Sequence, residues 1–269
     1  MTHATTKKPR SKNIPARYLV PNTITLIALC SGLTSIRFAY EQRFELTIFA
    51  VLFAAILDGI DGRAARLLKA SSKFGAELDS LADFVNFGVA PGIIVYFWAL
   101  KDFKSLGWIV ALTYSVCICL RLARFNVETE EENAAPWRKK FFQGTPAPAS
   151  AGLLLMPFYT NFLGVEVIIP NSIILVYTIV ISLLAASSIP TFSFKDLGSI
   201  PRQSIRAGLV IIILLVSVLA TFTWESLIAF GLIYLLTIPF SIIKFSKYEK
   251  NEIKLSDEEQ MNLTEQDFE

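Results

Sequence analysis

The sequence is poor in the residues that form covalent cross-links or soft metal sites. Its one histidine, His3, lies in a polar N-terminal stretch, where we expect no catalytic role. The three cysteines, Cys30, Cys117 and Cys119, lie in apolar runs without a C-x-x-C spacing. Such cysteines usually behave as small buried hydrophobic residues. The pattern therefore argues against disulfide bonds and against metal sites built from sulfur or imidazole ligands.

Charged residues are also scarce. They make up only 18% of the 269 residues, whereas 53% are hydrophobic and the mean hydropathy is +0.51. This balance is too apolar for a soluble domain, and several apolar runs approach or exceed the roughly 20 residues that cross a bilayer. No short apolar core is followed by a cleavage site of small residues, so we expect no secretory signal peptide. The composition predicts an all-α integral membrane protein.

The apolar segments predict about eight transmembrane helices. They cover approximately residues 19–40, 44–68, 74–100, 106–124, 147–163, 168–187, 207–223 and 226–243. We expect residues 1–16 to form a basic cytoplasmic arm, 17–248 the polytopic membrane domain, and 249–269 an acidic, disordered tail. The polar stretch 125–145 is expected to be a solvated loop.

The distribution of basic residues orients these helices. If both termini are cytoplasmic, all but four of the 25 lysines and arginines fall on the cytoplasmic side; the four are Arg37, Arg43, Lys101 and Lys104. This asymmetry follows the positive-inside rule. A seven-helix arrangement would instead place the basic stretch 244–254 outside. We therefore expect eight spans in the cell membrane with both termini in the cytoplasm.

Four aspartates stand out near the junction of the second and third predicted helices: Asp58, Asp61, Asp79 and Asp83. At about 100° per residue, the first two share one helical face and the last two share another. The polar connection 69–73 is short enough to fold the two helices back antiparallel, and Ser71 or Ser72 can cap the third helix. The four carboxylates would then converge at the cytoplasmic ends of both helices.

Clustered carboxylates repel one another unless cations neutralise them. Oxygen ligands without nearby histidine or cysteine favour hard ions, namely magnesium, manganese or calcium. Two such ions form the usual clamp for displacement at phosphorus, and the planar fork of Arg66 suits a phosphate oxygen. The alternative is a pair of helix ends with solvated charges, although glycines and aspartates at i, i+4 and i+8 are poor surface residues.

The motif D-x-x-D-G-x-x-A-R, followed after eight residues by G-x-x-x-D-x-x-x-D, runs from Asp58 to Asp83. It resembles the signature of the CDP-alcohol phosphotransferase family, and every specified position is present. The resemblance implies a membrane enzyme with two Mg²⁺ or Mn²⁺ ions that moves a phosphatidyl-type group from a CDP-linked lipid to an alcohol. It also implies a homodimer, because members of this family often form dimers.

The resemblance further implies roles for individual residues. Asp58, Asp61, Asp79 and Asp83 would bind the metal ions, and Asp83 would also be the catalytic general base; the residues alone do not say which aspartate is the base. The CDP-lipid would contact Asn22, Thr25, Gly62, Arg66, Ser72 and Gly75. For the P-N-x-x-T stretch that contains Asn22 and Thr25, an N-terminal helix cap is the alternative.

Four more stretches resemble the phosphatidylserine synthase branch of the family: DFVNFGVAPG after Ala82, RLARFN at 121–126, FQGTPAPASAG at 142–152 and SIPTFSFK at 188–195. This implies transfer from CDP-diacylglycerol to L-serine, with release of CMP. A serine carboxylate needs a cation, so Arg121 and Arg124 are acceptor-binding candidates, together with Asn86. Membrane anchoring by the arginines and a helix–helix hydrogen bond by Asn86 are the alternatives.

Two other functions are compatible with parts of this pattern. The acceptor could be glycerol 3-phosphate or an inositol phosphate, but these dianions call for a larger cationic cluster. Eight spans with intramembrane acids also describe a transporter; against this, the acids are confined to one helical pair at one membrane surface. We expect membrane lipids as partners and no nucleic acid.

Overall fold

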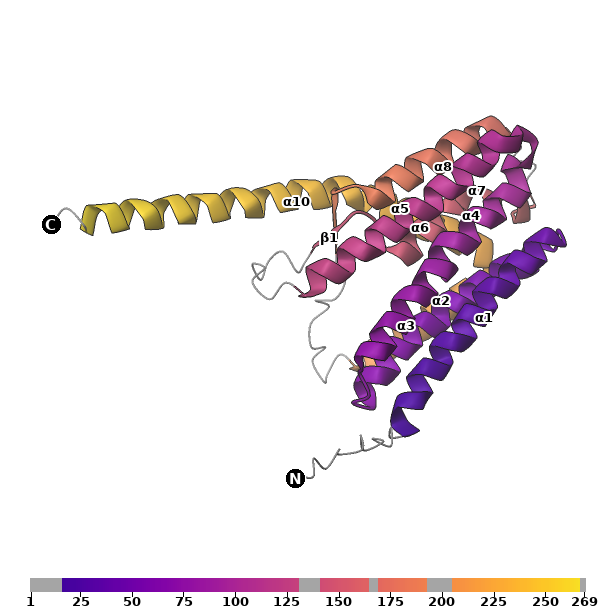
Figure 1. The fold of residues 1–269 in the computed structure, drawn as a ribbon, viewed down its shortest axis with the longest axis horizontal. Helices are drawn as coiled ribbons and strands as arrows, with labels where there is room; N and C mark the ends of the chain where they lie inside the picture. Colours follow the sequence, from indigo (N-terminus) through magenta and orange to yellow (C-terminus); the bar gives the residue numbers. More distant parts are fainter. Residues whose placement is uncertain (1–15, 131–140, 165–168, 193–204, 267–269) are drawn as a thin grey trace, which may run out of the picture.

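The computed structural model describes residues 16–130, 141–164, 169–192 and 205–266, and this part of the chain is mostly helical (Figure 1). Its α-helices are α1 (Leu19–Tyr40), α2 (Phe44–Leu67), α3 (Lys73–Asp83), α4 (Ala90–Val95), α5 (Lys104–Glu130), α6 (Ala147–Leu154), α7 (Met156–Tyr159), α8 (Asn171–Ala186), α9 (Ile205–Thr221) and α10 (Thr223–Gln266). Two short strands, β1 (Phe141–Gln143) and β2 (Pro190–Phe192), pair antiparallel. The sequence had predicted an all-α fold. The structure differs from this prediction by the one short pair of strands that the described residues contain.

The first three helices form the part of the fold that carries the aspartates. Helices α1 and α2 pack along each other, and α3 packs against α1 (Figure 1). Ser72 precedes α3 with an extended backbone, and its Oγ accepts a hydrogen bond of 3.0 Å from the N–H of Gly75. The predicted serine cap is thus confirmed at Ser72, and it fixes where the third helix begins.

Helix α3 continues without a break through a π-helical segment, η2 (Phe84–Val89), then α4, then a second π segment, η3 (Tyr96–Leu100). A wider π turn shifts the backbone hydrogen bonds, and such turns are frequent at functional sites. Helix α5 supplies side-chain donors to η2: the Tyr114 hydroxyl donates to the carbonyl of Phe87 at 2.8 Å, and the Ser115 hydroxyl donates to that of Gly88 at 3.1 Å. These contacts fix α5 beside the residues that follow Asp83.

Two predicted boundaries are wrong. Helix α5 continues through Glu130, so the predicted loop 125–145 begins as helix; α10 continues to Gln266, into the predicted disordered tail. The stretch 249–266 is polar but rich in glutamate, lysine, glutamine and leucine, which are good helix formers, and the stretch 125–130 carries two glutamates. The drop in hydropathy indicates where a helix leaves an apolar environment. Both α5 and α10 continue beyond that point.

Several helices have the length and composition of membrane spans. Within the described ranges, Leu19–Tyr40, Lys73–Glu128 and Thr223–Lys250 are long and apolar enough to cross a bilayer, and Asn171–Ala186 is a shorter apolar helix. Large hydrophobic side chains such as Ile213, Leu236 and Phe240 are exposed on α9 and α10. An outer surface of this kind is expected when lipid, not water, surrounds the helices. The fold is that of an integral membrane protein.

Candidate active site

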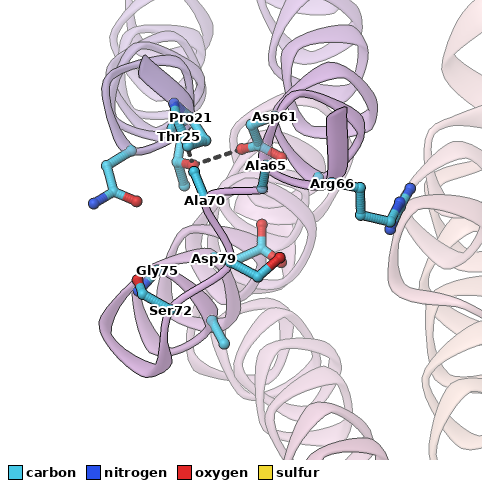
Figure 2. Close-up of a pocket in the computed structure, with 13 residues that line it drawn as sticks. Pro21, Thr25, Asp61, Ala65, Arg66, Ala70, Ser72, Gly75 and Asp79 are labelled. Atoms are coloured by element: carbon cyan, nitrogen blue, oxygen red, sulfur yellow. Dashed lines mark hydrogen bonds between the residues drawn. The ribbon is translucent and has the colours of Figure 1, made fainter. Parts of the chain in front are cut away.

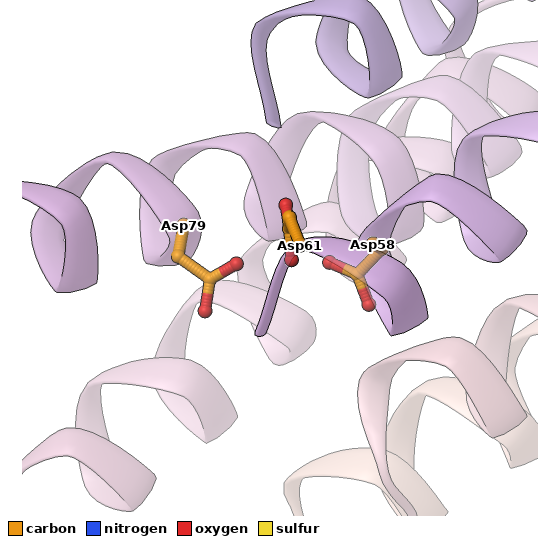
Figure 3. A group of neighbouring side chains, drawn as sticks. All are labelled: Asp58, Asp61 and Asp79. Carbon is orange, nitrogen blue, oxygen red and sulfur yellow. The ribbon is translucent and has the colours of Figure 1, made fainter. Parts of the chain in front are cut away.

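Three of the four aspartates come together where α2 and α3 meet. Asp58 and Asp61 lie in the last turns of α2, and Asp79 lies in α3 (Figure 3). One carboxylate oxygen from each of the three residues lies within 4.8 Å of the other two. Asp83, one turn beyond Asp79, has its carboxyl group beside that of Asp58. The convergence that the helical spacing predicted is therefore present.

The donor set fits a hard divalent cation. Oδ1 of Asp61 and Oδ1 of Asp83 are buried and have no hydrogen-bond partner among the described residues. In the same part of the chain, the ion pairs of lysine and arginine involve Glu41 alone, so no basic side chain is in ion-pair contact with the aspartates. Buried carboxylates without partners are costly unless a bound cation compensates them. Oxygen ligands alone suit Mg²⁺ or Mn²⁺.

Thr25 of α1 holds one of these carboxylates. Its hydroxyl group donates a hydrogen bond of 2.6 Å to Oδ2 of Asp61, and both residues are buried. Figure 2 shows this bond as a link between α1 and α2. The sequence had suggested a CDP-lipid contact for Thr25, with an N-terminal helix cap as the alternative. The hydrogen bond to Asp61 depends on the packing of α1 against α2 and left no signal in the sequence.

A pocket of about 260 Å³ adjoins the aspartates (Figure 2). Its lining comes from the start of α1, the end of α2, the connection to α3 and the first turns of α3: Pro21, Asn22, Thr25, Asp61, Gly62, Ala65, Arg66, Ala70, Ser71, Ser72, Gly75, Ala76 and Asp79. All six residues that the motif assigned to the CDP-lipid are in this set. Pro21, Ala70 and Ala76 were not predicted; they are apolar and carry no chemical signal of their own.

The two glycines of the motif differ in their surroundings. A Cβ atom added at Gly62 would meet nothing within 4 Å, so the backbone of α2 is open to the pocket there. At Gly75 it would lie 3.1 Å from Oγ of Ser72 and 3.2 Å from Oδ1 of Asn22, because α1 and α3 approach closely. Arg66 lines the pocket, and in the view of Figure 2 its side chain extends away from Asp61 and Asp79.

The structure separates the two arginines that were candidates for acceptor binding. Arg121 is only 7% exposed, its Nε has no hydrogen-bond partner among the described residues, and its charge acts on Asp83. Arg124 instead donates hydrogen bonds of 3.1 Å to the carbonyl oxygens of Ala186 and Ser187, at the C-terminal end of α8. Of the two arginines, only Arg121 therefore keeps a buried donor without a partner in the described part of the chain.

Asn86 lies in η2, just beyond Asp83. It is 1% exposed, and neither atom of its side-chain amide has a hydrogen-bond partner in the described part of the chain. It packs against Gly32 of α1 so closely that a Cβ at that glycine would overlap with its Oδ1. Within that part of the chain, the amide does not form the helix–helix hydrogen bond that was the alternative.

Apolar helices that hold a carboxylate cluster beside a small pocket define an integral membrane protein with a candidate metal centre. The sequence model of the CDP-alcohol phosphatidyltransferase family matches residues 18–185, which include α1 to α8 almost entirely. The chain belongs to this family.

Several similar proteins are named CDP-diacylglycerol–serine O-phosphatidyltransferase. The one from Mycobacterium leprae (strain TN) is 47% identical over 146 residues, which are 54% of this chain and 48% of that protein. The one from Helicobacter pylori (strain J99) is 42% identical over 139 residues, 52% of this chain and 56% of the relative. The one from Bacillus subtilis (strain 168) is 37% identical over 143 residues, which are 53% of this chain and 77% of that protein. The chain thus spans about half the length of the first two relatives.

Proposed function

We propose that the protein transfers the phosphatidyl group of CDP-diacylglycerol to the hydroxyl group of L-serine, which gives phosphatidylserine and CMP. The observation that carries this proposal is the position of Asp58, Asp61 and Asp79, whose carboxylates converge beside a pocket lined by every residue that the motif assigns to the CDP-lipid. The relatives named for this reaction support the same acceptor.

Asp58, Asp61, Asp79 and Asp83 would hold two divalent ions, Mg²⁺ or Mn²⁺. Bound ions would supply the positive charge that neutralises the diphosphate and stabilises CMP as it leaves. The protein's own groups orient the donor: the open backbone at Gly62 admits the cytidine diphosphate, Ser72 and Asn22 contact the nucleotide side of the pocket, and Arg66 binds a phosphate oxygen.

The acceptor would bind on the side of the aspartates where Asp83, Asn86 and Arg121 lie. Asp83 takes the proton from the serine hydroxyl group as that oxygen attacks phosphorus. Arg121 pairs with the serine carboxylate, and its buried, unpartnered Nε supports this role. Arg124, in contrast, is engaged with the end of α8 and would support the fold.

We further propose eight spans, with both termini and the site at the cytoplasmic surface of the cell membrane and with residues 17–248 as the catalytic domain of a homodimer. The lysine and arginine distribution supports this orientation. With the site at the cytoplasmic surface, the nucleotide and serine would lie in water and the acyl chains in lipid.

An acceptor panel tests the reaction. Purified protein in lipid nanodiscs receives labelled CDP-diacylglycerol with serine, glycerol 3-phosphate or inositol phosphate in turn, with Mg²⁺ or Mn²⁺ present. We expect CMP release and a phosphatidylserine product with serine. Preference for either phosphate acceptor would overturn the serine assignment, and absence of metal-dependent CMP release with every acceptor would overturn the transferase.

A further inference from the structure

Asn126, the last residue of the RLARFN stretch, has no role in the proposed reaction, yet it contacts the helix that carries two of the aspartates. It lies in α5, and its side-chain amide meets Ser80 of α3, the residue after Asp79. Nδ2 of Asn126 donates a hydrogen bond of 3.1 Å to Oγ of Ser80. The Ser80 hydroxyl group donates to Oδ1 of Asn126 at 3.3 Å. We call this contact the Ser80–Asn126 pair.

A second set of contacts joins α5 to the continuation of α3. The Tyr114 hydroxyl group donates to the carbonyl of Phe87 at 2.8 Å. The Ser115 hydroxyl group donates to the carbonyl of Gly88 at 3.1 Å. The helices are close here, because a Cβ added at Gly88 would lie 3.1 Å from Cγ2 of Ile118. Tight packing of this kind leaves α5 little freedom to move at this level.

The two sets of contacts define how α5 is aligned with the helix that begins as α3. The two helices run antiparallel, because residue numbers rise along one as they fall along the other. Counted from the tight contacts and from the Ser80–Asn126 pair, Asp83 lies at the level of residues 120 and 123 of α5, respectively. Arg121 falls within this interval. The proposed carboxylate-binding arginine is therefore level with the proposed general base.

Arg121 lies along α5 between the two contacts. At a rise of 1.5 Å per residue, it is about 9 Å from Ser115 and about 8 Å from Asn126. On its other side, α5 is held by the hydrogen bonds of Arg124 to the end of α8. Without the Ser80–Asn126 pair, this part of α5 would stay attached to α8 and could move relative to α3. A misplacement of about 1 Å at an active site can reduce a rate about a hundredfold.

We propose that the Ser80–Asn126 pair positions the acceptor site: it holds α5 at a fixed distance from α3, so that one serine can reach Arg121 with its carboxylate and Asp83 with its hydroxyl group. This inference rests on the proposed function. Ser80 and Asn126 are positioning residues, and neither belongs to the lining of the pocket assigned to the CDP-lipid. Donor binding should therefore not depend on the pair.

The test is Asn126→Ala, assayed in nanodiscs with saturating Mn²⁺. We expect kcat/KM for serine to fall about tenfold to a hundredfold, while the KM for CDP-diacylglycerol stays unchanged. The pair is exposed, so water can replace its hydrogen bonds and the unfolding temperature should stay close to that of the wild type. Asn161→Ala, which removes an exposed amide in η6 (Thr160–Phe162), is the matched control and should keep wild-type kinetics.

Two comparisons separate positioning of Arg121 from a general structural effect. In an Arg121→Ala background, Asn126→Ala should reduce kcat/KM for serine less than about twofold further, because the group that it positions is already absent. Serinamide keeps the hydroxyl group but lacks the negative charge, and the wild type and Asn126→Ala should use it equally. Ser80→Ala should reproduce the effect of Asn126→Ala, and the double variant should be no worse than either.

The outcomes distinguish this inference from the proposed function. If the wild type uses serine and Asn126→Ala has the same kinetics, the inference is overturned and the proposed function stands. The same holds if Asn126→Ala impairs serinamide as much as serine, if its effect persists in full without Arg121, or if the effects of Ser80→Ala and Asn126→Ala add. If the wild type does not use serine, both are overturned.

Discussion

The hydroxyl group of Thr25 and Oδ2 of Asp61 are 2.6 Å apart and join α1 to the end of α2. Asp61 is only 3% exposed, and its other oxygen, Oδ1, has no partner in the described part of the chain. Oδ2 of Asp61 is thus held by the protein, whereas Oδ1 is available to a ligand. Such outer contacts fix the orientation of metal-binding carboxylates and strengthen metal binding.

Thr25→Val should therefore weaken metal binding without unfolding the protein, because valine keeps the shape of threonine and loses its hydroxyl group. We expect the Mg²⁺ or Mn²⁺ concentration for half-maximal activity to rise about tenfold to a hundredfold. Isothermal titration with Mn²⁺ provides a readout that does not depend on turnover. Thr25→Ser, which keeps the hydroxyl group, is the control, and an unchanged metal requirement in Thr25→Val would contradict the role assigned to this hydrogen bond.

Asp58→Asn, Asp61→Asn and Asp79→Asn should each abolish activity, because each removes a negative oxygen ligand from a cluster whose oxygens lie within 4.8 Å of one another. EDTA should abolish wild-type activity, and added Mg²⁺ or Mn²⁺ should restore it. Asp102→Asn, in the exposed turn Lys101–Phe103 before α5, should retain wild-type rates. Full turnover in metal-free buffer would rule out the metal-dependent mechanism.

Gly32→Ala should disturb the packing of α1 against η2, since the added Cβ would overlap with Oδ1 of Asn86. Overpacking of this kind costs about 1–3 kcal/mol, and the displaced amide should also reduce turnover with serine. Thermal unfolding in detergent measures the first effect. Gly208→Ala in α9 is the control, because a Cβ there meets nothing within 4 Å and alanine favours a helix. Equal stability of the two variants would show that the contact between Gly32 of α1 and Asn86 of η2 accommodates an added methyl group without cost.

Arg121→Ala and Arg124→Ala should have different effects, although the two residues are one helical turn apart. Arg121→Ala should raise the serine KM about tenfold to a hundredfold, because a charge-assisted contact is lost. Arg124→Ala removes two hydrogen bonds to the end of α8 and should lower the unfolding free energy by roughly 1–3 kcal/mol with little change in serine KM. If only Arg124→Ala changed the serine KM, the acceptor carboxylate would have to be placed at the end of α8.

The proposed orientation can be checked by labelling single cysteines in a background without Cys30, Cys117 and Cys119. A cysteine at position 138 should react with a membrane-impermeant thiol reagent only after the membrane is opened, because the basic residues around it are expected to stay in the cytoplasm. Lys104→Cys, at the predicted outer surface, should react in intact cells. Labelling of position 138 from outside would reverse the orientation and the location of the site.

The sequence by itself determined the features that depend on local geometry. The period of an α-helix places Asp58 with Asp61 on one face and Asp79 with Asp83 on another. The short connection between the helices and the Ser72 cap then leave an antiparallel pair as the arrangement in which these faces meet. The bounds of α1, α2 and the long third helix also follow closely from hydropathy, because most residues of a membrane helix are apolar.

Only the tertiary structure decided which distant side chains meet. Thr25 reaches Asp61 because α1 packs along α2, and the β1–β2 pair forms because α5 and α8 bring its strands together. Arg121 and Arg124 look equivalent in the sequence, yet Arg121 is buried with its Nε unpartnered among the described residues, whereas Arg124 donates hydrogen bonds to the end of α8. Periodicity specifies the face of a helix, but the neighbour of that face depends on how all the helices cross and pack.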